Sequence, residues 1–267
     1  WTMGSSIDSQ EFNYDDTGWK DKLTRYYSQA DAKTYTLTYD AIGNPLQYRS
    51  GMAMTWQNDR ELATLTRTNS ASSLDRWEYA YDVNGQRKSK TEKHATSANG
   101  SWTTKKTTQY YYDGIKLVAE KKGGTIVWYD YDETGSPVGM RVNAQDYLFK
   151  KNIQGDIEGL YNSYGEEVVT YTYNSWGKVT EVSGDLASTV GEYNSLRYRG
   201  YYYDSDTGLY YLNSRYYDPE TCRFVNADGY NSTGQGIIGN NMYAYCGYNP
   251  INRVDVSGLL FEEIGQF

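Results

Sequence analysis

One short unit recurs along most of the chain: an aromatic residue, Asp or Asn, two or three further residues, and then Gly. Six copies are clear: Tyr14–Gly18, Tyr39–Gly43, Tyr81–Gly85, Tyr131–Gly135, Tyr173–Gly177 and Tyr203–Gly208. Weaker copies occupy Trp56–Asp59, Tyr112–Gly114, Asn152–Gly155 and Tyr217–Cys222. The side chain of Asp or Asn accepts hydrogen bonds at the start of a turn, and Gly adopts the positive φ that closes it. Each copy therefore predicts the turn of a β-hairpin.

The segments between these turns have the composition of β-strands. Three of them are rich in β-branched and aromatic residues, often in alternation: Lys33–Tyr39, Thr125–Tyr129 and Glu167–Tyr173. The Asp or Asn of four turns recurs at steps of 19, 20 and 22 residues, at Asp113, Asp132, Asn152 and Asn174. Each step has room for one pair of strands. We therefore predict an all-β fold in which hairpin repeats form one continuous, spiralling antiparallel sheet.

Tyrosine has to supply much of the core of this sheet. The chain contains 31 Tyr and 7 Trp but only 5 Phe and 5 Met. A buried Tyr contributes a large apolar ring, but its hydroxyl needs a hydrogen-bond partner. We therefore expect a thin sheet whose faces meet water or a wet cavity, in place of a dry, leucine-rich core.

Several classes of function are disfavoured by the composition. The net charge of -8 argues against nucleic acid or anionic lipid as the main partner, and no apolar run is long enough for a membrane helix. A single histidine, His94, allows neither a Ser-His-Asp triad nor a usual zinc site. Cys222 and Cys246 make no disulfide framework. The glycine-rich run 234–239 lacks the parallel strand-to-helix unit of a dinucleotide site, so we expect no cofactor and no metal.

Beyond residue 195 the sequence changes character and becomes highly specific. Five stretches carry the signature in order: Leu196–Asp204, Thr207–Pro219, Arg223–Asp228, Asn241–Cys246 and Tyr248–Asp255. They resemble the core segment associated with RHS repeats. The upstream turns resemble the YD repeats of RHS proteins, of the B and C components of insecticidal toxin complexes, and of teneurins. The resemblance covers residues 10–259.

This resemblance implies an architecture. In the family, the repeats wind into a hollow shell that encloses a C-terminal polypeptide, and the core segment plugs the shell. The implied division is 1–194 for the β-shell, 195–259 for the core segment, and 260–267 for the start of the C-terminal cargo or a linker. Closing a shell takes more repeats than occur here, so we expect an arc or the terminal coils of a shell that upstream repeats would complete.

The resemblance also implies a reaction, because many members cut their own chain after the Leu of an Asp-x-x-Gly-Leu ending. Here that ending is 255–259, which places the cut between Leu259 and Leu260. Two carboxylates can hydrolyse a peptide if one activates water and the other donates a proton. Asp228 takes the water-activating role and Asp255 the acid role, while Arg223 is the candidate to orient or charge-balance the pair.

Two departures from the family pattern leave the activity open. Proline usually follows both acids, whereas Gly229 and Val256 occupy those positions here. Asp is a favoured turn residue, so Asp228 and Asp255 could also be simple turn caps. The main hypothesis is a secreted or surface-exposed bacterial shell for a C-terminal toxin or effector, with one self-cleavage step. The alternative is a silent container, or an adhesive module whose exposed Tyr and Trp stack on carbohydrate.

Overall fold

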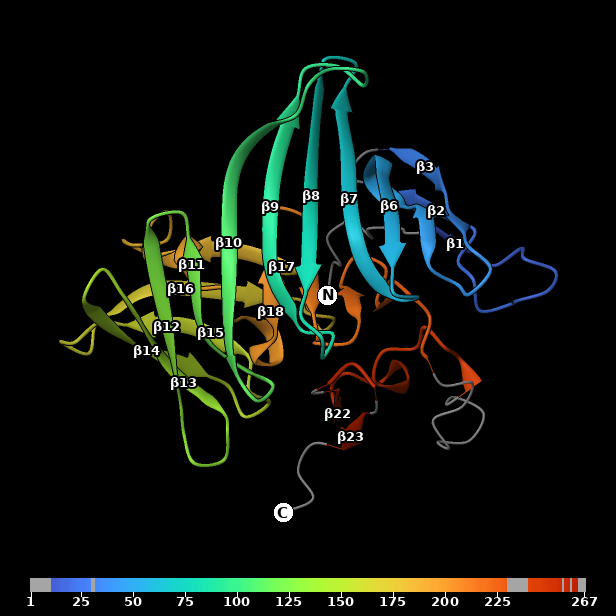
Figure 1. Cartoon of the computed structure of the whole chain (residues 1–267). Coiled ribbons are helices and arrows are strands. Elements are labelled where there is room, and N and C mark those ends of the chain that lie inside the picture. Colours follow the sequence, from blue (N-terminus) through green and yellow to red (C-terminus); the bar gives the residue numbers. More distant parts are fainter. Residues whose placement is uncertain (1–10, 30–31, 230–239, 256, 260, 264–267) are drawn as a thin grey trace, which may run out of the picture.

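The computed structural model describes residues 11–29, 32–229, 240–255, 257–259 and 261–263. Almost all of its regular structure is antiparallel β-sheet (Figure 1). The largest sheet has 14 strands in the order β17 to β4, so every strand pairs with its neighbours in the sequence. We call it the wall sheet. The prediction of a continuous antiparallel sheet of hairpins is confirmed.

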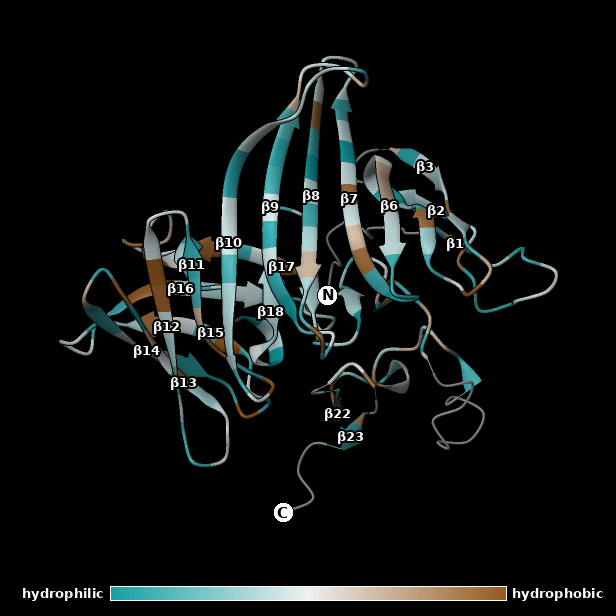
Figure 2. Ribbon diagram, in the orientation of Figure 1, coloured by the Kyte–Doolittle hydropathy of each residue, from teal (hydrophilic) through white to brown (hydrophobic). Residues whose placement is uncertain are grey.

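The strands of the wall sheet lengthen towards its middle. They are β4 Thr38–Tyr39, β5 Pro45–Gln47, β6 Met52–Gln57, β7 Glu61–Ser70, β8 Ser73–Tyr81, β9 Arg87–Ala95, β10 Thr103–Asp113, β11 Lys116–Lys122, β12 Thr125–Tyr131, β13 Pro137–Val142, β14 Gln145–Lys151, β15 Ile157–Tyr161, β16 Glu167–Tyr173 and β17 Val179–Ser183. Figure 2 shows β7 hydrophobic in its first half, where Leu62 and Leu65 are buried, and hydrophilic towards its exposed end.

Three smaller sheets accompany the wall sheet. They consist of β1 Glu11–Asn13, β2 Arg25–Ser28 and β3 Lys33–Thr36; of β18 Tyr202–Asp204, β19 Leu209–Tyr211, β20 Tyr216–Asp218 and β21 Arg223–Phe224; and of β22 Arg253–Val254 and β23 Glu262–Glu263. The short helices are α1 Val190–Tyr193 and the 3-10 turns η1 Arg49–Gly51, η2 Tyr198–Gly200 and η4 Cys246–Tyr248. In the described part of the chain, no helix is both long and apolar enough to cross a membrane.

Six hairpin turns of the wall share one geometry. In each, an Asp or Asn Oδ1 accepts the backbone N–H groups two and four residues later, and the Gly three residues later has φ between +77° and +87°. The turns begin at Asp40, Asp82, Asp132, Asn152, Asn162 and Asn174. The turn at Asn162 was not predicted, although Tyr161–Gly165 fits the repeat. The same geometry recurs for two reasons. The Asp or Asn side chain accepts hydrogen bonds as a backbone carbonyl would, and Gly adopts a positive φ without a clash of a Cβ atom.

Two predicted features differ in the structure. The strand expected over Lys33–Tyr39 is broken at Leu37, whose N–H donates to the Thr24 carbonyl, so β3 and β4 belong to different sheets. Asp204, expected to cap a turn, instead has its carboxylate buried between two cations from the wall.

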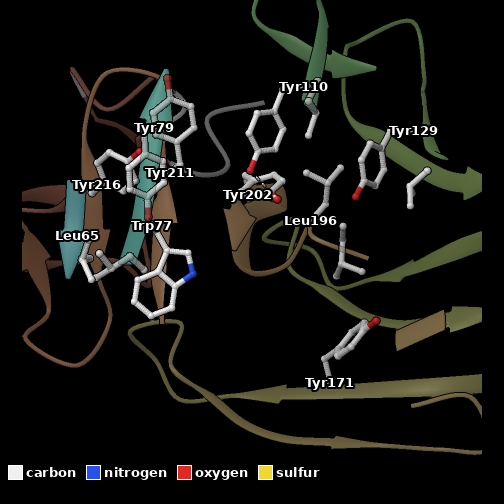
Figure 3. Close-up of a cluster of buried hydrophobic side chains, with 14 of the residues drawn as sticks. Leu65, Trp77, Tyr79, Tyr110, Tyr129, Tyr171, Leu196, Tyr202, Tyr211 and Tyr216 are labelled. Atoms are coloured by element: carbon white, nitrogen blue, oxygen red, sulfur yellow. Dashed lines mark hydrogen bonds between the residues drawn. The ribbon is translucent and has the colours of Figure 1, made fainter. Parts of the chain in front are cut away.

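The last strand of the wall sheet, β17, ends at Ser183. We call residues 195–259 the core segment, and its described residues pack against the wall. Figure 1 shows the wall curving around β18 of the core segment. Buried tyrosines from both parts form the main hydrophobic cluster, as Figure 3 shows for Tyr110 of the wall and Tyr202 of the core segment. Their ring centroids lie 5.3 Å apart in an edge-on arrangement. The core is thus rich in tyrosine, and many of the hydroxyls find polar partners across the interface.

Polar bonds fix the core segment against the wall as well. They join Arg87 and Lys90 to Asp204, Arg49 to Asp218, Asp156 to Arg199, Glu120 to Tyr202, Arg60 to the Ala227 carbonyl, and Tyr243 to the Gly43 carbonyl. Most partners are buried, and each bond connects residues far apart in the sequence. The wall therefore determines where the loops of the core segment lie.

Candidate active site

A single guanidinium contacts both candidate acids. Arg215 lies just before β20, Asp228 follows β21, and Asp255 follows β22. Arg215 Nη1 lies 3.1 Å from Asp228 Oδ2, and Arg215 Nη2 lies 3.5 Å from Asp255 Oδ2. All three residues are at most 5% exposed. The fold therefore brings two carboxylates that are 27 positions apart in the sequence to one buried cation.

Both carboxylates contact the same guanidinium, and Arg60 lies near enough to act electrostatically on Arg215. Burial raises the pKa of Asp255 to about 6, although Arg215 and nearby backbone N–H groups act in the opposite direction. Burial also lowers the pKa of Arg215, against the attraction of both acids. A carboxyl group with such a pKa can hold a proton near neutral pH, which is the property that a general acid needs.

Asp255 is also the cap of the turn that precedes the expected cut. Its Oδ1 accepts the N–H of Gly258 at 2.7 Å and that of Leu259 at 3.1 Å. Its own N–H donates to the Tyr201 hydroxyl at 3.1 Å. The turn-cap interpretation therefore describes real contacts of Asp255. It does not account for the second oxygen, which faces Arg215.

Two side chains of the core segment donate hydrogen bonds to the carbonyl groups of this turn. Ser214 Oγ donates to the Ser257 carbonyl at 2.7 Å, and Arg215 Nε donates to the Gly258 carbonyl. Gly258 has φ +74°, and a Cβ there would lie 2.7 Å from Ser214 Oγ and 2.8 Å from the Leu212 carbonyl oxygen. Any side chain at this position would have a strained backbone conformation and would also collide with Ser214 and Leu212. These contacts therefore fix the backbone conformation of the residues that precede Leu259.

The described contacts of Arg223 include Asp21 and Tyr243. Its guanidinium donates to the Asp21 carbonyl and lies over the ring of Tyr243, with 4.7 Å to the centroid. Among the described residues, the ion pairs with both acids are made by Arg215, so the role of Arg223 as their charge-balancing partner stays a prediction. Arg215 lies in the Thr207–Pro219 stretch of the signature, and no feature of the sequence marks it as a partner of the acids.

The other predicted residues fall as follows. Gly229 is exposed next to Asp228, and Leu259 is partly exposed at the end of the turn. Val256 and Leu260 lie outside the described residues. Cys222 and Cys246 are free thiols. Within the described ranges, no group of three His, Cys, Asp or Glu residues is arranged to hold a metal ion.

His94 belongs to the wall sheet, where its side chain contacts Asp75, and it takes no part in the candidate site. It lies in β9, where its Nδ1 is 2.9 Å from Asp75 Oδ1, and its side chain is 28% exposed. Asp75 is the residue opposite His94 on the neighbouring strand β8.

Comparison with known proteins gives clear relatives. No protein-family model matches the chain. It is 31% identical over 227 residues to the tRNA nuclease WapA of Bacillus subtilis (strain 168), and 28% identical over 244 residues to the double-stranded DNA deaminase toxin A of Burkholderia cenocepacia (strain H111). These alignments cover 84% and 83% of the chain, but only 9% and 16% of the relatives.

A solved structure shares the fold. The crystal structure of TcdB2-TccC3-Cdc42 matches 94% of the chain with a TM-score of 0.67 at 21% identity, and the match covers 13% of that chain. The similarity extends over the wall sheet and the core segment together, since so little of the chain is left out.

Proposed function

We propose that this chain, which belongs to the YD/RHS-repeat family, is part of a shell that encloses a C-terminal toxin or effector. We also propose that it cleaves itself after Leu259 and so releases this cargo. The relatives that it matches include toxin proteins, of which it spans a small fraction. The cargo, the upstream repeats of the shell and a secreted or surface location in bacteria are parts of this proposal. So is the division into shell 1–194, core segment 195–259 and cargo or linker 260–267.

The observation that carries the proposed cut is the shared contact of Asp228 and Asp255 with Arg215. Asp255 is buried beside a second buried carboxylate, and burial disfavours its ionised form. An acid pair with one proton is the arrangement that a peptide hydrolase of this class uses. Asp255, whose pKa is raised to about 6, holds that proton in the proposal.

The reaction would proceed by addition of water to the Leu259 carbonyl carbon while Asp228 accepts the proton of the water. The tetrahedral centre then collapses, the C–N bond to Leu260 breaks, and Asp255 delivers its proton to the leaving nitrogen. The products are a Leu259 carboxyl group and a Leu260 amine. Arg215 holds both acids and the Gly258 carbonyl, so its contribution is orientation and charge balance.

Intact-mass measurement of the freshly expressed full chain tests the proposal. The expected product lacks residues 260–267, and both Asp228→Asn and Asp255→Asn should leave the chain whole. Asp130→Asn is the matched control, because Asp130 is exposed on β12, and this variant should be cut like the parent. An uncut parent chain would refute the protease and leave the silent container. A glycan-array signal that is lost when exposed Trp or Tyr residues are replaced would instead favour the adhesive alternative.

A further inference from the structure

The chain downstream of the proposed cut returns to pair with the chain upstream of it. Strand β23 pairs antiparallel with β22, with Glu262 opposite Val254 and Glu263 opposite Arg253. The proposed scissile bond, between 259 and 260, lies in the connection between these two strands. Cleavage there would open a hairpin whose two arms are both held by the core segment.

Side chains reinforce this pairing. The Arg253 guanidinium lies 4.6 Å from the centroid of the Phe261 ring, and its Nη2 lies 3.5 Å from Glu263 Oε1. Phe261 and Val254 both pack against the buried cluster that contains Tyr201 and Tyr245. We call Arg253, Val254, Phe261 and Glu263 the clasp. A two-residue ladder is too short to be stable alone, so the clasp depends on this packing and on Arg253.

The clasp and the acid site fix the two sides of the same bond. On the amino-terminal side, Asp255 binds the N–H groups of Gly258 and Leu259, and Arg215 binds the Gly258 carbonyl. On the carboxyl-terminal side, the first described residue, Phe261, is already in contact with Arg253. Restricting both sides of a reacting bond reduces the entropy that must be lost on reaching the transition state.

We propose that the clasp is the recognition element for the leaving side of the cut: Arg253 selects an aromatic residue at position 261 and an acid at position 263, and so positions the bond. The proposal rests on the proposed self-cleavage and adds its downstream specificity. Arg253, Phe261 and Glu263 are positioning residues, since they act through the conformation of the connection and do not touch the reacting atoms.

A charge exchange tests the clasp in the full 267-residue chain. The protein is refolded from urea, and the loss of residues 260–267 is followed over time by intact mass. Glu263→Arg should slow the cut by about fivefold, because a partly exposed ion pair contributes at most a factor of about this size. Arg253→Glu should slow it further, because the contact with Phe261 is lost too. The double variant should be faster than Arg253→Glu, because the ion pair is restored with reversed sign.

Glu262→Arg is the matched control, because neighbouring strand residues point to opposite sides and Glu262 does not face Arg253. It should cut at the parent rate. If Glu263→Arg also cuts at the parent rate, or if the double variant is no faster than Arg253→Glu, the clasp is overturned while self-cleavage stands. If the parent stays whole, or Asp255→Asn is cut like the parent, the proposed function itself fails and the clasp falls with it.

Discussion

The buried ion pair between wall and core segment gives the sharpest prediction of stability. Arg87 Nη1 lies 2.5 Å from Asp204 Oδ2, and Lys90 Nζ lies 2.6 Å from Asp204 Oδ1. Arg87 is fully buried, and its guanidinium lies within 4.6 Å of the ring centroids of Tyr110, Tyr202 and Tyr211. Although burial raises it, the two cations hold the pKa of Asp204 below its usual value. Asp204 is therefore the ionised counter-charge of both.

Asp204→Asn removes that charge and keeps the size of the side chain. Breaking a buried ion pair by neutralising one partner costs about 3–5 kcal/mol, because the remaining charge stays buried without compensation. Lys90 keeps Asp206 at 2.9 Å, whereas Arg87 keeps mainly aromatic rings and the Tyr216 hydroxyl. At a urea dependence of about 3 kcal/mol per molar, a loss of about 4 kcal/mol lowers the unfolding midpoint by about 1.3 M.

Urea unfolding followed by tyrosine and tryptophan fluorescence measures this shift. Asp146→Asn is the matched control, because Asp146 also pairs with an arginine, Arg141 at 2.5 Å, but both side chains are more than half exposed. Water screens that pair, so its midpoint should stay within the error of the fit. Equal midpoints for the two variants would refute the view that the buried charges anchor the core segment.

Two further predictions concern the acid site and the turns. Because Asp255 has a pKa raised to about 6 by burial and acts as the proton donor, the cleavage rate should fall about tenfold per pH unit above 6, measured by intact mass after refolding at each pH; a rate that is constant from pH 5 to 8 would contradict this role. Gly155 and Gly177 have similar φ values of +86° and +82°, but a Cβ at 177 would lie 2.5 Å from Tyr198, whereas one at 155 meets nothing within 4 Å. Gly155→Ala should therefore cost only the strain of about 1–2 kcal/mol, and Gly177→Ala clearly more in urea unfolding; equal losses would show that the overlap is relieved by small shifts.

Local sequence was sufficient to predict the wall. A turn of Asp or Asn followed by Gly needs only residues within five positions of one another, so the same letters give the same hydrogen bonds at Asp40, Asp82 and Asn174. Asn162 obeys the same rule and could have been found from the sequence. The alternation of aromatic and β-branched residues then makes the intervening segments strands of one sheet.

The candidate site was only partly accessible from the sequence. The signature singled out Asp228 and Asp255, and the structure places both against one arginine. The signature could not tell which arginine contacts the acids, because Arg215 precedes β20 and Arg223 lies in β21, and only the packing of these strands brings one of them to both acids. The clasp was also not predictable, because no sequence motif indicates that β23 pairs with β22.

What the sequence determined by itself is the hairpin repeat, because its hydrogen bonds close within a few residues. What only the tertiary structure decided is which charges meet. Asp204 has the letters of a turn residue, yet its carboxylate pairs with Arg87, 117 positions away. Such a contact is selected by the curvature of the whole sheet and by the cost of leaving a buried charge alone, and neither is encoded in the neighbours of one residue.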